Sequence, residues 1–326
     1  MTRAIRFHAT GGPEVLRIEP IEIGDPGPGE VRLRQTAIGV NFTDVYSRSG
    51  LYPAPLPCIP GREAAGVVEA VGEGVEGWAP GDRASYASVS GAYVEARLIE
   101  ARRLIRLPEV IDDRTAAAAT LRGLTAHMLL HAVHTVRSGE TILVHAAAGG
   151  VGAILTQWAA SLGAVVIGVV SSPEKAALAR AGGCAHVIVG READIAGEVA
   201  AVTGGAMVSV VYDAVGRASF ARSLDSLARR GHFVSYGQAS GPIPPIAIQD
   251  LGARGSLTLT RPMLGDYIDD PSVRAAMAES LFARIASGAV RIRMEAVFPF
   301  EQAAEAHRAL ESGATSGSVI LIADPS

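Results

Sequence analysis

The sequence contains few of the residues that mark several common classes of protein. Its 326 residues include only two cysteines, Cys58 and Cys184, which lie far apart in the chain. A disulfide-stabilised secreted fold and a cysteine-rich metal site are therefore disfavoured, and a cytoplasmic location is expected. The 29 basic and 33 acidic residues give a formal net charge of -4. This balance disfavours a nucleic-acid partner, because polyanion binding needs excess positive charge.

The chain also lacks a clear membrane signal. Residues 1–7 interleave charged and apolar side chains, so we expect no export signal. Residues 141–173 contain no Asp, Glu, Lys or Arg, but glycines at 149, 150, 152 and 163 interrupt them. A buried strand, helix and second strand explain this segment better than a membrane-spanning helix, and no membrane partner is expected.

What remains is a long apolar chain, with 48% hydrophobic residues, that can form two domains. The first 120 residues are rich in β-branched residues and in Gly/Pro turns, which predicts a compact β-barrel-like domain. Its predicted strands are Ala4–His8, Val15–Glu19, Val31–Ile38, Ala64–Val71 and Tyr93–Leu98.

From about Asp112 the chain becomes alanine-rich and helical, and from Thr141 strands alternate with helices. Alternation of this kind predicts an α/β domain with a doubly wound parallel sheet. The predicted strands are Thr141–His145, Val165–Val170, His186–Val189, Val208–Tyr212, His232–Tyr236 and Ser256–Thr260. The predicted helices are Gly152–Leu162, Pro173–Ala181, Asp194–Thr203 and Ala218–Leu227. A further helix at Ser272–Ser287, a strand at Val290–Phe298, a helix at Glu301–Glu311 and a strand at Ser318–Ala323 complete the chain.

A glycine-bearing turn follows the first strand of this second domain. Residues 145–152 have the spacing A-x-x-G-x-x-G, with glycines at 149 and 152, and lead into a helix. Such a turn lets the backbone approach a pyrophosphate, while the helix N-terminus supplies N–H groups to the anion. The strand and helix on either side of the turn favour dinucleotide binding over a turn without a ligand.

The next strand indicates which dinucleotide binds. NAD sites usually have an acid near its end, whereas this chain has Ser171, Ser172 and then Lys175, its only lysine. Ser172 is predicted to cap a helix that has Pro173 at its first position. Lys175 then lies in the first turn, where the helix dipole disfavours a cation unless an anion is nearby. We therefore expect these three residues to hold the adenosine 2′-phosphate of NADPH; a solvent-exposed lysine is the alternative.

Several stretches together resemble the medium-chain dehydrogenase/reductase superfamily, and within it the zinc-free, zeta-crystallin-like NADPH:quinone oxidoreductases. They are Gly11–Leu16, Ile38–Asp44, Arg48–Tyr52, Gly61–Gly66, the turn at 145–152 and Tyr212–Gly216. The resemblance implies a GroES-like β-barrel catalytic domain at 1–122, a Rossmann dinucleotide-binding domain at 123–264 and a return to the catalytic domain at 265–326. It also implies a homodimer, which we expect to form through the edge strand at 256–261.

No metal is expected. Zinc-dependent relatives of this superfamily have a histidine where this chain has Arg62, and a cysteine near the position of Asn41. A guanidinium cannot ligate zinc. The histidines at 127, 131 and 134 lack a nearby cysteine or acid, so we interpret them as helix-surface residues.

The chain has neither a G-x-S-x-G turn nor a Gly-Lys-Ser/Thr phosphate loop. Hydride transfer remains, and a quinone or other activated acceptor needs no Lewis acid. We expect NADPH-dependent reduction of a quinone in an interdomain cleft. Alternatives are a reductase of enones or enoyl-thioesters acting on an activated alkene, and a non-enzymatic NADPH-binding protein of the crystallin-like or RNA-binding kind.

The resemblance also implies roles for individual residues. Four would orient the nicotinamide and the acceptor in the cleft: Asn41, Asp44, Tyr46 and Tyr52. Asp44 could instead be a helix-capping acid, and the two tyrosines could be packing residues. The residues implied to bind the cofactor are Phe42, Tyr46, Met128, Gly149, Gly150, Val151, Ser171, Ser172, Lys175, Val215, Gly237, Gln238, Ser240, Pro262 and Leu264. Gly190 and Gly313 stand at positions where some relatives have a Tyr and an Arg against the cofactor.

Overall fold

The computed structural model describes residues 1–313 and 315–323, and its internal contacts divide the chain into two compact units. Unit 1 comprises Met1–Arg122, Ile268–Ala286 and the described residues from Ile292 onward, and unit 2 comprises Gly123–Tyr267 and Ser287–Arg291. Residues 287–291 were expected to return to the first domain. They belong instead to unit 2, where the Gln157 amide donates to the Arg291 carbonyl at 3.1 Å and accepts from its N–H at 2.9 Å.

Unit 2 is built on a parallel six-stranded sheet with the order β10-β9-β8-β11-β12-β13. Its strands are β8 (Thr141–His145), β9 (Val165–Val170), β10 (His186–Val189), β11 (Val208–Asp213), β12 (Leu227–Ser235) and β13 (Thr258–Thr260). The chain runs outward from β8 to β10 and then returns to β11 on the other side of β8. This order confirms the predicted doubly wound sheet, with a switch point between β8 and β11.

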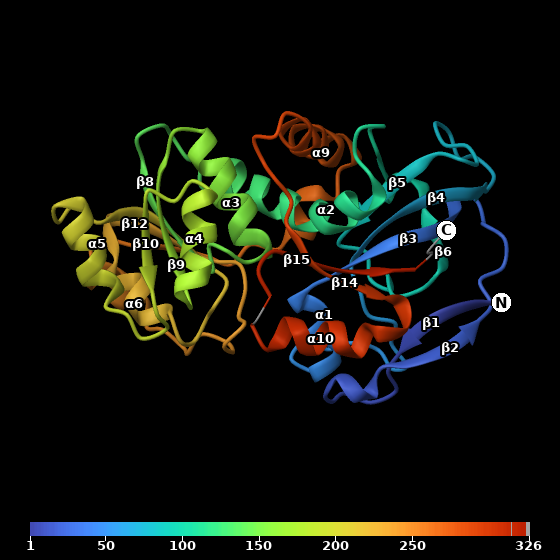
Figure 1. Ribbon diagram of the computed structural model, residues 1–326, viewed down its shortest axis with the longest axis horizontal. Coiled ribbons are helices and arrows are strands. Elements are labelled where there is room, and N and C mark those ends of the chain that lie inside the picture. Colours follow the sequence, from blue (N-terminus) through green and yellow to red (C-terminus); the bar gives the residue numbers. More distant parts are fainter. Residues whose placement is uncertain (314, 324–326) are drawn as a thin grey trace. The chain divides into compact units, whose positions relative to one another are not determined.

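Both faces of this sheet are covered by helices. The helices of this part of the chain are α3 (Gly150–Ser161), α4 (Pro173–Ala181), α5 (Ile195–Thr203), α6 (Phe220–Asp225), α7 (Ile248–Ala253) and α8 (Leu264–Ile268). Helices α3 and α4 pack on one side of strands β8–β10, and α5 and α6 lie on the other (Figure 1). Leu143, Ile167 and Phe233 from the strands form a buried core with Val199 of α5 and Leu224 of α6. Because both faces are buried, the central strands β8, β9 and β11 are largely apolar, whereas the edge strand β13 is Thr-Leu-Thr.

Unit 1 contains a seven-stranded sheet with the order β14-β15-β3-β4-β5-β7, and β6 also pairs with β3. Its strands are β3 (Glu30–Val40), β4 (Glu63–Val71), β5 (Arg83–Ala87), β6 (Ala96–Glu100), β7 (Ile105–Arg106), β14 (Met294–Pro299) and β15 (Ser318–Ile322). Strands β1 (Thr2–Arg6) and β2 (Arg17–Ile21) form a separate antiparallel pair. This is the expected GroES-like architecture, in which the C-terminal β14 and β15 complete the sheet begun by β3.

Helices pack around this sheet. They are α1 (Phe42–Ser49), α9 (Pro271–Ala286) and α10 (Ala303–Glu311), with 3-10 turns η1 (Pro13–Val15), η2 (Ala101–Arg103) and η4 (Phe300–Gln302). Helix α2 (Asp113–His127) leads from unit 1 into unit 2 and continues as a π-helical segment, η3 (Met128–Val133). Buried Val45 of α1 and Leu310 of α10 belong to the core of the β-sheet.

Two element boundaries differ from the prediction for clear local reasons. The helix predicted at Ala218–Leu227 is only Phe220–Asp225, because Leu227 already pairs with Val208 in the sheet. The strand predicted at Val15–Glu19 is Arg17–Ile21, since Pro13–Val15 form a 3-10 turn. Among the described residues, no helix is both long and apolar enough to span a membrane.

Replacement of Leu143 by alanine tests the core of unit 2. Leu143 lies in β8 and is 0% exposed. We expect Leu143→Ala to lower the free energy of unfolding by about 2–5 kcal/mol, because the lost methyl groups leave a cavity. The measurement is urea unfolding followed by circular dichroism. Ile248→Ala is the control, because Ile248 is 80% exposed and its change is expected to stay within about 0.5 kcal/mol. Equal losses for the two variants would contradict this core assignment.

Candidate functional site

The predicted phosphate-binding turn lies directly between β8 and α3. His145 ends the strand, Gly149 is the N-cap residue in extended conformation, and the helix begins at Gly150, two residues earlier than predicted. Gly150 and Val151 thus form the first turn of the helix, where backbone N–H groups have no acceptor within the helix. These N–H groups and the helix dipole make the turn suitable for an anion.

Gly152 allows the close approach of this helix to the turn. A Cβ atom at Gly152 would lie 2.1 Å from the backbone oxygen of Ala146, a distance that no side chain tolerates. Ala146 itself adopts a left-handed conformation with φ +51°. The turn is therefore shaped by a missing side chain, as the glycine fingerprint requires.

The end of β9 carries the residues predicted to select the coenzyme. Ser172 is the N-cap of α4, its hydroxyl accepts from the Lys175 N–H at 3.4 Å, and Pro173 follows it. The predicted cap is therefore confirmed. Lys175 lies half-buried in the first turn of α4, and Ser171 is exposed. A phosphate near this helix end would meet a hydroxyl, an ammonium and the positive end of a helix dipole.

The loop after β11 is organised by Asp213, which the sequence analysis did not select. This buried carboxylate accepts from the N–H groups of Val215 at 2.7 Å and Gly216 at 3.0 Å, and from the hydroxyls of Ser219 and Ser223. The Ser223 hydroxyl also contacts His145 Nε2 at 2.8 Å. Burial lowers the pKa of His145, so this imidazole is neutral. Asp213 thus fixes the backbone at Val215, a predicted cofactor residue.

The loops after β11 and β12 are joined to each other. The Ser240 hydroxyl donates to the Val215 carbonyl at 2.7 Å and accepts from the Ala218 N–H at 3.0 Å. Gly237 and Gln238 precede it in the same loop. The structure therefore brings the residues predicted after β8, β9, β11 and β12 to the carboxyl edge of four neighbouring strands.

Three further residues that were predicted to bind the cofactor lie outside the loops after β8, β9, β11 and β12. Pro262 is buried just after β13, and Leu264 is half-buried at the start of α8. Met128 is 1% exposed and begins the π-helical segment η3. Gly190, one of the two departures from relatives, has φ +119°, a backbone conformation that a tyrosine adopts only with strain.

In unit 1, two of the predicted catalytic residues form the N-terminus of α1. Asn41 is the N-cap, and its N–H donates to Asp44 Oδ2 at 2.8 Å. Asp44 is 1% exposed and also accepts from the Tyr93 hydroxyl at 3.2 Å. Burial raises the pKa of Asp44 to about 7, against the opposing effects of the Asn41 N–H, Arg62 and Tyr93. Asp44 is thus a helix-capping acid, as the alternative interpretation of this residue held.

A buried ion pair holds Asn41 in turn. The Asn41 amide donates to Glu63 Oε1 at 2.8 Å, and Arg122 contacts the same oxygen at 3.0 Å. The Leu121 N–H donates to the other Glu63 oxygen at 2.7 Å. Burial raises the pKa of Glu63, while Arg122 and Asn41 favour its charged form. The three hydrogen bonds that the Glu63 carboxylate accepts thus come from fixed groups, and the Asn41 amide is held in one orientation.

The aromatic residues predicted beside them lie together. The rings of Tyr46 and Tyr52 meet edge to face with centroids 5.2 Å apart, and Phe42 lies 6.1 Å from Tyr46. The Tyr52 N–H donates to the Tyr46 carbonyl at 3.0 Å, which places Tyr52 beside α1 although it follows the helix in sequence. These three rings provide an aromatic surface next to the capped helix end.

The donor set at the position of the catalytic zinc of related dehydrogenases does not suit zinc. Arg62 carries no lone pair for a metal, and the oxygens of Glu63 are engaged by Arg122, Leu121 and Asn41. Within residues 1–313 and 315–323, no cluster of three His, Cys, Asp or Glu side chains could hold a metal ion.

The histidines of the α2 and η3 region are more enclosed than expected. The rings of His127 and His131 lie 4.6 Å apart, and both pack on Trp158 of α3. His134 instead contacts Glu140 at 2.7 Å. His127 and His131 are thus half-buried helix residues whose shared i, i+4 face packs on Trp158, which is 0% exposed.

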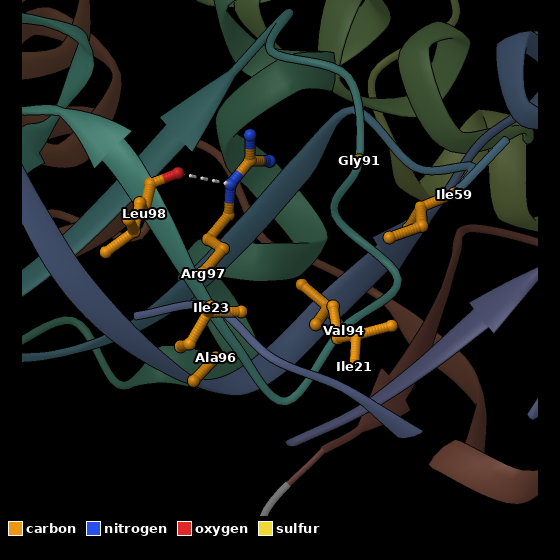
Figure 2. A pocket seen from close by; sticks show the side chains of 8 residues that line it. All are labelled: Ile21, Ile23, Ile59, Gly91, Val94, Ala96, Arg97 and Leu98. Carbon is orange, nitrogen blue, oxygen red and sulfur yellow. Dashed lines mark hydrogen bonds between the residues drawn. The ribbon is translucent and has the colours of Figure 1, made fainter. Parts of the chain in front are cut away.

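A small apolar cavity of about 260 Å³ lies in unit 1 (Figure 2). Isoleucines 21, 23 and 59 line it, together with the stem of Arg97, whose Nε donates to the Leu98 carbonyl at 3.4 Å. None of the predicted site residues contributes to it. The chemistry predicted from the sequence therefore has no connection with this cavity.

Comparison with known proteins agrees with this arrangement. The alcohol dehydrogenase GroES-like domain matches residues 27–109, and the zinc-binding dehydrogenase family matches residues 182–321. The quinone oxidoreductase of Pseudomonas aeruginosa is 48% identical over 324 residues, covering 99% of this chain and 100% of that protein. The 2-haloacrylate reductase of a Burkholderia species is 44% identical over 331 residues, covering 99% of each.

Solved structures give the same result. The crystal structure of the Escherichia coli quinone oxidoreductase complexed with NADPH matches with a TM-score of 0.96 and 44% identity, covering 99% of this chain and 100% of that one. Identity at this level over the full length, together with the GroES-like and doubly wound units, shows the family. The chain belongs to the quinone oxidoreductase family of the medium-chain dehydrogenase/reductase superfamily.

Proposed function

We propose that this protein is an NADPH-dependent quinone reductase that works without a metal. The observation that carries the proposal is the turn between β8 and α3, in which Gly152 lets a helix N-terminus approach the end of a strand. A relative with 44% identity was crystallised with NADPH, which agrees with this use of the turn.

The residues at the carboxyl edge of the sheet fit this coenzyme. Gly149, Gly150 and Val151 would hold the pyrophosphate through backbone N–H groups. Ser171, Ser172 and Lys175 would hold the adenosine 2′-phosphate, because the end of β9 has no acid in the place where NAD sites have one. Val215, Gly237, Gln238 and Ser240 would contact the nucleotide from the loops after β11 and β12, with Met128, Pro262 and Leu264 completing the group.

Bound NADPH supplies a hydride, and the quinone takes up this hydride and one proton to become a quinol. The role of the chain is then to orient the acceptor and to stabilise the charge that develops on its oxygen. We assign this to Asn41, whose amide is fixed by Glu63, and to the aromatic group of Phe42, Tyr46 and Tyr52. Asp44 positions this group by capping α1.

A second candidate acceptor is an activated alkene. It is favoured by the 2-haloacrylate reductase that shares 44% identity with this chain over its full length. An alkene conjugated to an electron-withdrawing group accepts a hydride by the same chemistry, so the two candidates share one site.

We also propose that the protein is a cytoplasmic homodimer. Strand β13 lies at the edge of the sheet in unit 2, and an edge strand offers backbone groups for pairing with a second copy. The strand is shorter and more polar than predicted, with Thr258 and Thr260 on either side of Leu259. Light scattering after size exclusion tests the oligomeric state.

The acceptor is tested by following NADPH oxidation at 340 nm with a panel of acceptors. We expect turnover with naphthoquinone and phenanthrenequinone, and no loss of rate when a chelator is present. Crotonyl-CoA, short enones and 2-chloroacrylate are the comparison acceptors. Faster turnover of 2-chloroacrylate than of every quinone would favour the second candidate, and no turnover of any acceptor would refute both.

Replacement of Lys175 tests the choice of coenzyme. A charge-assisted hydrogen bond contributes about 1.5–3 kcal/mol, so Lys175→Ala is expected to weaken NADPH binding about 10- to 100-fold and to leave NADH binding nearly unchanged. Isothermal titration measures both affinities. Arg180→Ala removes a cation from the other end of α4 and is the matched control. An unchanged ratio of the two affinities in Lys175→Ala would disprove this assignment.

Replacement of Gly152 tests the turn itself. A methyl group at this position meets the Ala146 carbonyl, so Gly152→Ala is expected to displace the helix end. The affinities for NADPH and NADH should then fall together, by about tenfold or more, because both coenzymes have the same pyrophosphate. Gly252→Ala in α7 is the control, since a Cβ atom there meets no neighbour within 4 Å. Unaltered coenzyme binding by Gly152→Ala would show that the turn does not hold the pyrophosphate.

A further inference from the structure

Four buried side chains of unit 1 form one continuous hydrogen-bonded chain. Arg48 contacts His307 Nδ1 at 3.0 Å, His307 Nε2 contacts the Tyr93 hydroxyl at 3.0 Å, and this hydroxyl contacts Asp44 Oδ2 at 3.2 Å. Each of the four residues is at most 2% exposed. Buried polar side chains of this kind need a reason, because each one loses its contacts with water.

The direction of every hydrogen bond in this chain follows from Arg48. A guanidinium has only donors, so His307 Nδ1 must accept and the imidazole proton must be on Nε2. Nε2 then donates to the Tyr93 oxygen, and the Tyr93 hydroxyl has only Asp44 Oδ2 to donate to within this chain. Asp44 Oδ2 receives this hydrogen bond and a second from the Asn41 N–H. The tautomer of His307 thus decides where the Tyr93 proton points.

The hydrogen-bonded chain of side chains connects the two ends of helix α1. Asp44 lies in the first turn of α1 and Arg48 in its last turn, while His307 belongs to α10. Arg48 forms a bidentate ion pair with Glu311 of α10, with hydrogen bonds of 2.7 and 3.0 Å, and its Nε donates to the Gly11 carbonyl at 3.1 Å. Tyr46 lies between the two ends. The hydrogen-bonded chain therefore spans the helix that carries one of the proposed acceptor-binding residues.

The protonation states agree with this arrangement. Burial, aided by the positive charge of Arg48, lowers the pKa of His307 to about 3, so the imidazole stays neutral and keeps its direction at neutral pH. Asp44 is faced by the charged groups Arg62 and Glu63 and by the hydroxyl of Tyr93. Its own charge raises the pKa of the half-buried Cys58 thiol and of the buried Tyr86 phenol, in addition to the larger effect of burial on each.

We propose that His307 and Tyr93 are positioning residues for the reaction, which hold Asp44 as the cap of α1 and so keep Tyr46 in the geometry that the acceptor needs. This role rests on the proposed function, since it gives Tyr46 an acceptor to contact. Neither residue touches the acceptor itself.

The first test compares two replacements of His307. Glutamine keeps one acceptor and one donor, whereas leucine has neither. We expect His307→Leu to lower kcat/KM for the quinone about tenfold or more with an unchanged KM for NADPH, and His307→Gln to restore most of that loss. His8→Gln, at an exposed histidine that contacts Glu19, is the control. A purely structural role would lower the melting temperature of His307→Leu but leave kcat/KM intact.

Tyr93→Phe provides a second route if His307→Leu does not fold. It removes only the hydroxyl and should reproduce the loss in kcat/KM, and the double variant with His307→Gln should lose no more than Tyr93→Phe alone. Additive losses, or wild-type kcat/KM in folded Tyr93→Phe, would overturn the proposal.

A measurement that does not depend on activity uses the free energy of unfolding against pH. Asp44 has a raised pKa in the folded state, so the folded protein binds more protons and its stability falls as pH rises from about 4 to about 7. His307 has a lowered pKa, so the folded protein binds fewer protons and its stability rises from about pH 3 to 6.5. The two contributions oppose each other in the unaltered chain.

Single replacements should therefore reveal opposite slopes. Between pH 4 and 6.5 we expect Asp44→Asn to gain stability with rising pH relative to the unaltered protein, and His307→Gln to lose it. Parallel curves for the three proteins would overturn the assignment of charge in the chain. If these slopes appear but no acceptor is reduced, then the proposed function fails while the hydrogen-bonded chain stands. If quinones are reduced and the slopes are absent, then the proposed role of the hydrogen-bonded chain is refuted while the proposed function stands.

Discussion

The missing side chain at Gly152 is the constraint on which the nucleotide end of unit 2 depends. Because nothing projects from this residue, α3 can start immediately after the Ala146 turn and present its first N–H groups at the carboxyl edge of the sheet. The strand order then places the loops of β9, β11 and β12 along the same edge. Asp213 and Ser240 hold two of these loops by accepting and donating hydrogen bonds that the backbone would otherwise lack.

Unit 1 positions its candidate residues by a different means. There the N-terminal end of α1 is fixed by the buried pair of Glu63 and Arg122 behind Asn41, and its C-terminal end by buried Arg48, which reaches the partly exposed Glu311 beside His307. A buried pair of this kind is costly to form and more costly to break, so its main effect is to specify one geometry. In the proposed reaction, backbone N–H groups of unit 2 thus bind the coenzyme, and buried side-chain charges of unit 1 position the residues that orient the acceptor.

The sequence was sufficient for features that depend on local chemistry. The central parallel strands are largely apolar runs, and the Ser172–Pro173 cap and the glycine turn have signatures within a few residues. The edges of elements were less accurate where tertiary pairing decides them, as at Leu227, which joins a strand because Val208 lies beside it. The helix α1 was not assigned, because its eight residues make only about two turns, too few for a helical repeat to be recognised in the sequence.

The candidate residues followed the same division. Positions were predictable where a motif fixes them, whereas His307 could not be found, since Arg48 and Tyr93 lie 259 and 214 residues away in the chain. Asp213 lies in the Tyr212–Gly216 stretch and has its partners within 10 residues, so a local signal existed that the sequence analysis did not use. The packing of half-buried His127 and His131 on Trp158 was not predicted for the first of these reasons, as Trp158 belongs to another helix. Packing between distant segments has no signature in a single sequence.

The position of Lys175 has a practical consequence. It is the only lysine in the 326 residues, so its side chain is the only primary amine other than the chain's own terminus. Acylating or reductively alkylating reagents would thus mark a single side chain, located where α4 begins. A fluorophore or isotope attached there would sit at the end of β9 without any engineering of the sequence, and its signal would report directly on what occupies that corner of the sheet.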